Sequence, residues 1–336
     1  MKISASIYSN KEKDLTALVR ELDAHHIDML HVDCADDDKV FEDIAGIRKI
    51  SSTPIDLHII SSEPEKYFDR IEKLKIEYVS FQYENLERLP TVPPKTSTKF
   101  GLSVLSSTSL DVIEEMRDAG YSFVIIMCTT PGKSGGTFNG DSFQKIIEFK
   151  YRFPKTQIHV DGGINDQVAF ILRLLGVNAI VSGSYLLNHE SLGAGMLSFH
   201  KTPNNKPGSY LLSDFSVPVK YLPVLKKTDA DFKTILQTIE KFGLGFVAIT
   251  DESGALEGIV SNADVRRALL ANLSDLNKVS IASLINKKPV SISEKANLTD
   301  MIRLLNELNF IVLFLPMVDD KNQLKGAVLL NNLTRV

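Results

Sequence analysis

The sequence predicts a (β/α)8 barrel, the TIM-barrel architecture, followed by a smaller α/β domain. Up to about residue 187, short apolar runs that resemble strands alternate with segments that resemble helices. This alternation is typical of a parallel sheet, and eight such strands in fewer than 200 residues fit a compact barrel. From about residue 210 the pattern changes to a twofold internal repeat. A chain of 336 residues is also long enough for two domains.

The expected barrel elements follow the chain in a regular order. Strands are predicted at residues 2–7, 29–34, 55–60, 78–83, 100–105, 123–128, 157–161 and 179–183. Helices are predicted between most of them, at residues 12–25, 110–119 and 141–153 among others. Residues 189–209 break the alternation with several glycines and prolines, which indicates a last barrel helix and then a linker. We therefore expect a barrel over residues 1–200, a linker over 201–209 and a second domain over 210–336.

The second domain repeats one unit twice. Each copy has an amphipathic helix, an apolar strand, a turn and a second strand. In the first copy these are expected at 232–242, 246–249, 253–254 and from 256. In the second copy they are expected at 298–308, 311–315, 319–320 and from 324. Because one such unit buries little apolar surface alone, the two copies should pack together.

Composition narrows the range of partners and locations. A net charge of −4 offers no basic surface for nucleic acid, and no apolar run is long enough for a membrane span. Cys34 and Cys128 both lie in apolar runs, which favours a reduced environment without disulfides. The first residues lack the long apolar stretch of a secretory leader. We therefore expect a cytoplasmic protein without nucleic-acid or membrane partners, and a homo-oligomer.

Four acid and imidazole side chains could hold one metal ion. His31 and Asp33 alternate on one predicted strand and so share a face, and His58 and Asp161 can join them if the strands line a barrel. Two imidazoles with two carboxylates suit Zn²⁺, Fe²⁺, Mn²⁺ or Co²⁺ better than Mg²⁺. The two carboxylates could also act as an acid/base pair.

The same strands carry a set of ordered motifs. They are Ser6-Ile7-Tyr8, His31-Val32-Asp33, Asp56 to Ile60 with Pro64-Glu65, Met127 to Gly135, Val160 to Asn165, and Gly183-Ser184. Together, in this order and at barrel spacing, they make the first domain similar to the ribulose-phosphate 3-epimerase family over nearly its whole length.

The resemblance implies a specific chemistry. His31, Asp33, His58 and Asp161 would ligate a divalent metal, commonly Zn²⁺ or Fe²⁺. Asp33 and Asp161 would also carry protons to and from the two faces of an enediolate formed from a ketose phosphate of the ribulose 5-phosphate/xylulose 5-phosphate type. The phosphorylated sugar would contact Ser6, His58, Gly132, Lys133, Ser134, Gly135, Gly162, Gly163, Gly183 and Ser184.

Departures from the family pattern lie in the shell around the sugar. Ile60 replaces a methionine, Gln82 a histidine, and Lys133 and Gly136 a phenylalanine and a glutamine of the lid. An epimerase of a related sugar phosphate, as in surface-polysaccharide metabolism, is therefore one alternative. Another is an aldolase or decarboxylase that also acts through an enediolate, although no lysine for a Schiff base lies at a strand end. A third is an inactive barrel in a protein that serves as a nucleotide-sensing regulator.

The second domain resembles a tandem pair of CBS (cystathionine-β-synthase) domains. The first copy has the motif from Gly258 to Asp264, in which Ser261 would contact phosphate and Asp264 the ribose hydroxyls of an adenine nucleotide. The second copy has Leu329 and Asn332 at the matching positions and lacks both groups. The resemblance thus implies at most one site of this type, with an adenine nucleotide as regulatory ligand; an empty structural pair is the alternative.

Overall fold

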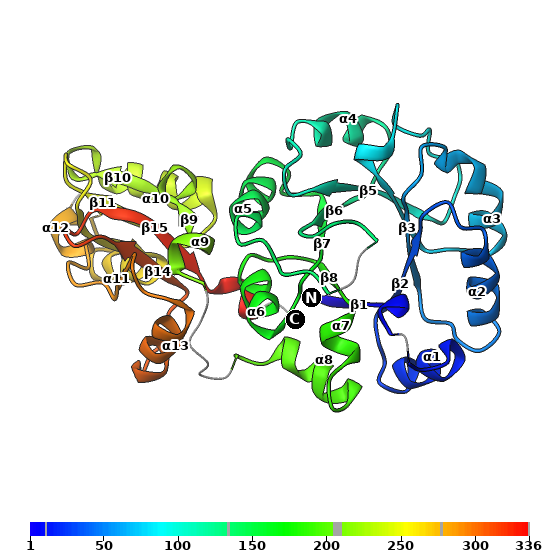
Figure 1. The fold of residues 1–336 in the computed structure, drawn as a ribbon. Coiled ribbons are helices and arrows are strands. Elements are labelled where there is room, and N and C mark those ends of the chain that lie inside the picture. Colours follow the sequence, from blue (N-terminus) through cyan, green and yellow to red (C-terminus); the bar gives the residue numbers. More distant parts are fainter. Residues whose placement is uncertain (11, 133–134, 204–209, 276–277, 335–336) are drawn as a thin grey trace. The chain divides into compact units, whose positions relative to one another are not determined.

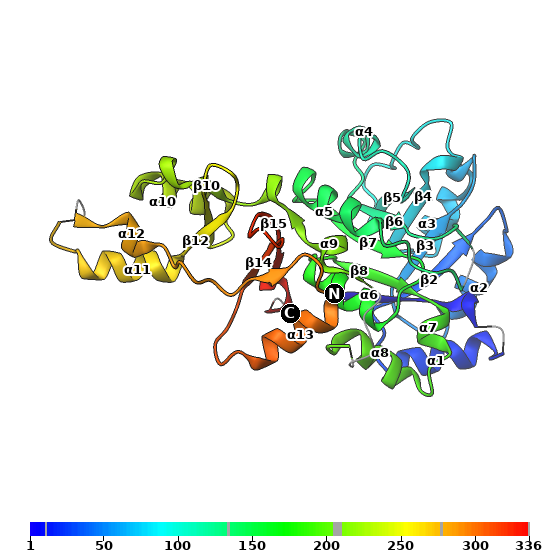
Figure 2. The same ribbon diagram turned by 60° about the vertical axis from the view of Figure 1, so that its left-hand side comes forward.

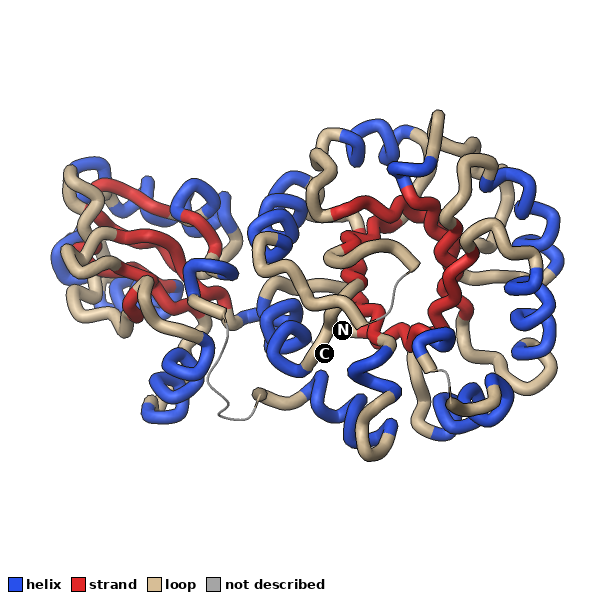
Figure 3. The backbone as a smooth tube through the Cα atoms, in the orientation of Figure 1, coloured by secondary structure: helices blue, strands red, loops and turns tan. Residues whose placement is uncertain are grey.

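A closed ring of eight parallel strands forms the first part of the chain in the computed structural model (Figures 1 and 3). The structure describes residues 1–10, 12–132, 135–203, 210–275 and 278–334. These form two compact units, one before residue 204 and one from residue 210. The strands are β1 (Lys2–Ser6), β2 (Met29–Cys34), β3 (Ile55–Ile59), β4 (Tyr78–Gln82), β5 (Lys99–Leu105), β6 (Phe123–Met127), β7 (Gln157–Asp161) and β8 (Ala179–Ser182). The predicted barrel is thereby confirmed.

Helices surround this ring because each has one apolar face to bury (Figure 3). They are α1 (Leu15–Ala24), α2 (Lys39–Ile47), α3 (Phe68–Lys73), α4 (Val112–Asp118), α5 (Ser142–Arg152), α6 (Asp166–Leu174), α7 (Ser184–Leu187) and α8 (Leu192–His200). In α5, for example, Phe143, Ile146 and Phe149 are fully buried. In the described parts of the chain, no helix has the length and apolar character needed to cross a bilayer.

The strand register sets which side chains meet inside the barrel. Parallel pairing places Asp33 of β2 opposite His58 of β3, two residues beyond the pair formed by His31 and Asp56. On the other side of the ring, Asp161 at the end of β7 pairs with Met127 of β6. Asp33, His58 and Asp161 therefore lie at or next to the C-terminal ends of their strands, where barrel enzymes carry their active sites, and His31 lies two residues before Asp33 on the same face of β2.

The second unit contains two small sheets (Figure 2). One is β10 (Val224–Lys226), β11 (Phe246–Thr250) and β12 (Leu256–Ser261); the other is β13 (Ile292–Ser293), β14 (Phe314–Val318), β15 (Leu324–Leu329) and β9 (Val217–Pro218). The helices are α9 (Leu212–Phe215), α10 (Phe232–Phe242), α11 (Asn262–Ala271), α12 (Ile281–Leu284) and α13 (Leu298–Glu307). The two copies meet where Phe246 and Phe314 stack at 3.7 Å between ring centroids.

One predicted strand of the second copy is misplaced. The apolar run at 311–315 was expected to form it, but β14 begins at Phe314 because antiparallel pairing with β15 sets its register. Phe310, Ile311 and Leu313 instead lie in the connection from α13 and are 57%, 86% and 49% exposed. A continuous apolar run does not reveal which of its residues find a pairing partner.

Candidate active site

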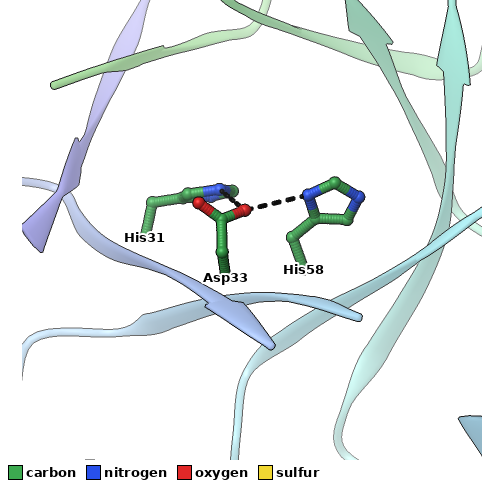
Figure 4. Close-up of side chains that lie close together, drawn as sticks. All are labelled: His31, Asp33 and His58. Atoms are coloured by element: carbon green, nitrogen blue, oxygen red, sulfur yellow. Dashed lines mark hydrogen bonds and ion pairs between the residues drawn. The ribbon is translucent and has the colours of Figure 1, made fainter. Parts of the chain in front are cut away.

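Two histidines and one aspartate meet at the C-terminal ends of β2 and β3 (Figure 4). Asp33 Oδ1 lies 3.3 Å from His31 Nε2 and 3.1 Å from His58 Nδ1. One ligand atom from each residue lies within 4.8 Å of the other two. The side chains of His31 and His58 are 1% and 0% exposed, whereas that of Asp33 is 25% exposed. The two histidines thus form the buried side of the cluster, and the Asp33 carboxylate lies on the side that faces the open end of the barrel.

Asp161 stands slightly farther out than the other three predicted ligands. Its Oδ2 lies 4.0 Å from His31 Nε2, and its side chain is 19% exposed. Because Asp161 projects from β7 and Asp33 from β2, the two carboxylates approach the same space from different strands. His31, Asp33 and His58 therefore form the compact group, Asp161 lies beside it next to His31, and the two carboxylates are the members that solvent can reach.

Each histidine ring has an inner nitrogen, which faces Asp33, and an outer nitrogen, which faces away from it. Each outer nitrogen lies opposite an oxygen acceptor. His31 Nδ1 lies 3.0 Å from Asp56 Oδ2, and His58 Nε2 lies 2.9 Å from Gln82 Oε1. An outer partner of this kind fixes which ring nitrogen carries the proton. The inner nitrogens of the neutral rings then present lone pairs to the Asp33 carboxylate. Lone pairs facing a carboxylate at about 3 Å repel unless a cation or additional protons lie between them.

The electrostatics of the cluster reflect this excess of acceptors. Burial disfavours a charged imidazole, yet the carboxylates of Asp56 and Asp33 raise the pKa of His31 well above its usual value. Burial raises the pKa of the Asp161 carboxyl to about 6, although the His31 imidazole acts in the opposite direction. Without a cation, the protein therefore holds protons in this cluster near neutral pH.

The contacts of Asp56 and Gln82 with the two histidines are parts of the site that the sequence alone did not predict. Asp56 is fully buried and accepts a hydrogen bond of 2.8 Å from the Ser4 hydroxyl. Its second oxygen, Oδ1, has no hydrogen-bond partner among the described residues. The available signal was spacing, because Asp56 lies two residues before His58 and so shares its face of the strand.

The predicted substrate glycines lie where the chain packs closely. Gly162 and Gly163 follow β7 with φ of +107° and +69°. A Cβ at Gly162 would lie 2.3 Å from Thr129 Oγ1, and one at Gly163 would lie 2.2 Å from the backbone nitrogen of Phe138. These glycines thus let the segment between β6 and α5 pack against the end of β7.

That segment reaches toward β3. A Cβ at Gly132 would lie 3.3 Å from Ile60 Cδ1, just beyond the end of β3, whereas one at Gly135 would meet nothing within 4 Å. The predicted contacts Lys133 and Ser134 lie outside the described residues. The described residues 128–132 thus run from the end of β6 toward Ile60 at the end of β3.

The remaining predicted substrate residues gather at β1 and β8. Ser6 ends β1, and its hydroxyl lies 3.0 Å from that of Ser9. Gly183 follows β8 and precedes Ser184, the first residue of α7. A Cβ at Gly183 would lie 2.0 Å from Ser9 Oγ, so this position requires a residue without a side chain.

The second unit has a pocket of about 570 Å³ beside its first copy of the repeat. Ser261 and Asp264 line it, together with the cationic side chains of Arg266, Arg267 and Lys288. The exposed apolar connection from Phe310 to Phe314 forms another part of the wall. The pocket thus combines an apolar surface, a carboxylate and several positive charges.

Ser261 and Asp264 also have a structural role at the start of α11. The Ser261 side chain accepts from the Asp264 backbone N–H, and Asp264 Oδ2 accepts from the Ser261 backbone N–H at 2.8 Å. This is a capping box, which stabilises a helix N-terminus. Asn297 and Asp300 form the same arrangement at α13 in the second copy. A local cap alone could therefore account for the serine and the aspartate, and binding requires a separate test.

Comparison with known proteins finds one family model in each unit. The profile of the ribulose-phosphate 3 epimerase family matches residues 2–187, and that of the CBS domain matches residues 281–336. The ribulose-phosphate 3-epimerase of Aquifex aeolicus is 31% identical over 183 residues, which are 50% of this chain and 81% of that protein. The ribulose-phosphate 3-epimerase of Bacillus subtilis is 26% identical over 198 residues, 55% of this chain and 91% of that protein.

Solved structures similar to the second unit include the CBS-pair protein CBSX2 from Arabidopsis thaliana. It has 26% sequence identity and a TM-score of 0.32, and the match covers 38% of this chain and 92% of that one. A structure of CBSX2 in complex with AMP has 25% identity and a TM-score of 0.33, with 38% of this chain and 95% of that one covered.

Proposed function

The chain belongs to the ribulose-phosphate 3 epimerase family, a family of isomerases, and its second unit is a CBS pair; from this premise we propose that the barrel is a metal-dependent epimerase of a ketose phosphate. The reaction would pass through an enediolate. The substrate would be of the ribulose 5-phosphate/xylulose 5-phosphate type. The observation that carries the proposal is the convergence of His31, Asp33, His58 and Asp161 at the open end of the barrel.

The donor set fits a divalent transition metal. The outer acceptors Asp56 and Gln82 leave the inner nitrogens of both histidines as lone-pair donors beside the Asp33 carboxylate. Imidazole and carboxylate ligands together suit Zn²⁺ or Fe²⁺, with Mn²⁺ and Co²⁺ as alternatives. When bound, such an ion supplies Lewis-acid stabilisation of negative charge that develops on the substrate oxygens.

Asp33 and Asp161 are the proposed proton carriers. They are the two members of the cluster that solvent can reach, and they project from strands on different parts of the ring. Epimerisation requires that one carboxylate remove a proton from carbon and that the other return a proton on the opposite face. The loop that follows β6 is the proposed lid, and it would exclude water from the bound sugar.

Deuterium exchange tests this proposal on the protein as purified. In D₂O, the wild-type protein should place deuterium at the epimerised carbon of a ketose phosphate, because the enediolate route removes that hydrogen as a proton. The measurement is mass spectrometry and proton NMR across a panel that includes ribulose 5-phosphate and xylulose 5-phosphate. If no sugar phosphate in a broad panel exchanges a C–H proton, the barrel is not an active epimerase.

A related sugar phosphate is a second candidate substrate, favoured by the residues near the lid and the metal cluster. Ile60 stands where a Cβ on Gly132 would touch it, and Gln82 occupies the place beside His58. Both residues differ from the family pattern described above. The panel should therefore include sugar phosphates of other chain lengths, such as those used in surface-polysaccharide synthesis, and the fastest exchange identifies the substrate class.

The pocket of the second unit is proposed to bind one adenine nucleotide that regulates the barrel. Its cationic side chains suit phosphate, its apolar wall suits a base, and Asp264 offers a carboxylate to ribose hydroxyls. The second copy has Leu329 and Asn332 in place of the serine and the aspartate. We therefore expect one site per chain.

Replacing Asp264 should weaken nucleotide binding by about 1.5–3 kcal/mol, because hydrogen bonds to a charged acceptor are lost. Calorimetry with AMP, ADP, ATP, CMP and S-adenosylmethionine would give the affinity and stoichiometry for wild type and Asp264→Ala. Asp300→Ala is the matched control, since it removes the equivalent helix cap from α13 without touching the pocket. Equal binding by Asp264→Ala and Asp300→Ala would refute this site. Binding that leaves turnover unchanged would refute regulation, because allostery requires coupling between the two sites.

A further inference from the structure

We propose that Gln82 and Glu84 form a positioning pair that sets the tautomer of His58 and so directs its Nδ1 lone pair into the metal cluster. The inference rests on the metal site proposed above. Gln82 and Glu84 are not themselves ligands of the proposed metal, and they act on the metal site through His58. It explains how the barrel ensures that the nitrogen facing Asp33 is free to bind a cation.

Gln82 lies between His58 and Glu84 at the end of β4. Its side chain is almost fully buried, with the residue 1% exposed. The amide oxygen faces His58 Nε2 at 2.9 Å, and the amide nitrogen donates to Glu84 Oε2. An amide accepts at one end and donates at the other, so turning it over would exchange the two roles.

Glu84 removes this ambiguity because a carboxylate only accepts. Its other oxygen, Oε1, accepts from the backbone N–H of Leu105 at 2.9 Å and from the Thr108 hydroxyl. These contacts anchor the carboxylate at the end of β5. The amide nitrogen of Gln82 must therefore point to Glu84, and the amide oxygen must point to His58.

The orientation of Gln82 decides the proton position on His58. With an acceptor opposite Nε2, that nitrogen must carry the proton. Nδ1 of the neutral ring then keeps its lone pair, which lies 3.1 Å from Asp33 Oδ1 on the side of the cluster. The series of hydrogen bonds from Leu105 through Glu84 and Gln82 to His58 thus crosses three strands and fixes which nitrogen of His58 carries the proton.

Glu84→Gln should reverse that direction. The anchors at Leu105 and Thr108 would hold the carbonyl of the new amide, so its NH₂ group would face Gln82. Gln82 would turn its oxygen toward that group and its nitrogen toward His58. His58 Nε2 would then have to accept, and the proton would move to Nδ1, where it blocks the metal. We expect Zn²⁺ affinity to fall by about 10–100-fold, the range for loss of an outer partner of a metal-binding histidine.

The exchange variant Gln82→Glu/Glu84→Gln should restore the lost affinity. The new carboxylate at position 82 would accept from His58 and from the new amide at position 84, which again places the proton on Nε2. Zinc affinity would be measured by competition with a chelator on the full-length metal-free protein. Glu87→Gln is the matched control. Glu87 is an exposed glutamate of the same segment, and among the described residues it makes no hydrogen bond to Gln82.

Two-bond ¹H–¹⁵N spectra of histidine-labelled protein report the tautomer directly, with His58 assigned by its absence from His58→Ala. The spectra are recorded on metal-free proteins that also carry Asp33→Asn, because this change removes the carboxylate that faces Nδ1. At a pH where the ring is neutral, the otherwise wild-type protein and the exchange variant should show the Nε2–H form, and Glu84→Gln the Nδ1–H form. An unchanged tautomer in Glu84→Gln, or an exchange variant as weak as Glu84→Gln, would overturn the positioning role. Wild type that binds no Zn²⁺ would instead overturn the metal site, and the spectra would still decide the role of the pair.

Discussion

A His58→Ala variant is expected to purify almost free of divalent metal, whereas the wild-type protein is expected to carry roughly one transition-metal ion per chain. His58 Nδ1 is one of the three ligand atoms that lie within 4.8 Å of one another. Losing a ligand should weaken binding by more than the roughly 10–100-fold that loss of an outer partner causes. Elemental analysis of both proteins after identical purification measures the metal content.

The matched control for this variant is His159→Ala. His159 is another buried barrel histidine, 3% exposed, but it stacks on Phe123 at 4.8 Å and takes no part in the metal cluster. It should lose stability without losing metal. A native His58→Ala protein with the metal content of wild type would show that the cluster is not the metal site.

Metal binding should also weaken as the pH falls. In the metal-free protein, the raised pKa of His31 keeps its imidazole protonated at neutral pH, and Asp161, with a pKa of about 6, takes up a proton as the pH falls toward and below that value. The ion must displace those protons, so its apparent affinity rises with pH through this range. Zinc titrations at several pH values between 5.5 and 8, on both sides of the Asp161 pKa of about 6, would measure this change in affinity. An affinity independent of pH would contradict this charge assignment.

Asp161→Asn is expected to lower epimerisation by about 10²–10⁴-fold, the contribution of a positioned general acid or base. The amide is nearly isosteric with the carboxylate but cannot carry the proton. Asp33 should still exchange the hydrogen on its own side of the sugar. The variant should therefore show deuterium wash-in without inversion when it is given one of the two epimers.

The matching variant Asp33→Asn separates the two faces of the sugar. It should exchange only the other epimer, if the two carboxylates act on opposite sides. Metal content must be measured for both variants, because Asp33 and Asp161 are also proposed ligands. Epimerisation at the wild-type rate by metal-loaded Asp161→Asn would exclude this residue as a proton carrier.

Much of the barrel was predictable from local pattern. The expected strands at 29–34 and 157–161 coincide with β2 and β7, and the other barrel strands differ by about one residue at an end. Apolar runs bounded by turn signals carry this information along a single strand. Because parallel strands of a barrel end at one rim, the positions of His31, Asp33, His58 and Asp161 already implied a common site.

The sequence could not show how these side chains bond to one another. The hydrogen bonds from His31 to Asp56 and from His58 to Gln82 join residues on neighbouring strands, 25 and 24 positions apart in the chain. They depend on strand register and rotamer, neither of which a linear pattern contains. The carboxylate of Glu84 is likewise held in place by the backbone N–H of Leu105, on a third strand.

The second unit shows the same division between local and distant information. Local periodicity was enough to find both copies of the repeat and the helices predicted at 232–242 and 298–308, which the structure has at 232–242 and 298–307. It could not find the start of β14, because only pairing with β15 selects Phe314 from a continuous apolar run. The sequence alone thus determined which residues form most helices and strands and which polar side chains lie near the strand ends. The tertiary structure decided the hydrogen-bond partners and the pockets, because hydrogen bonding and packing act between residues that are close in space.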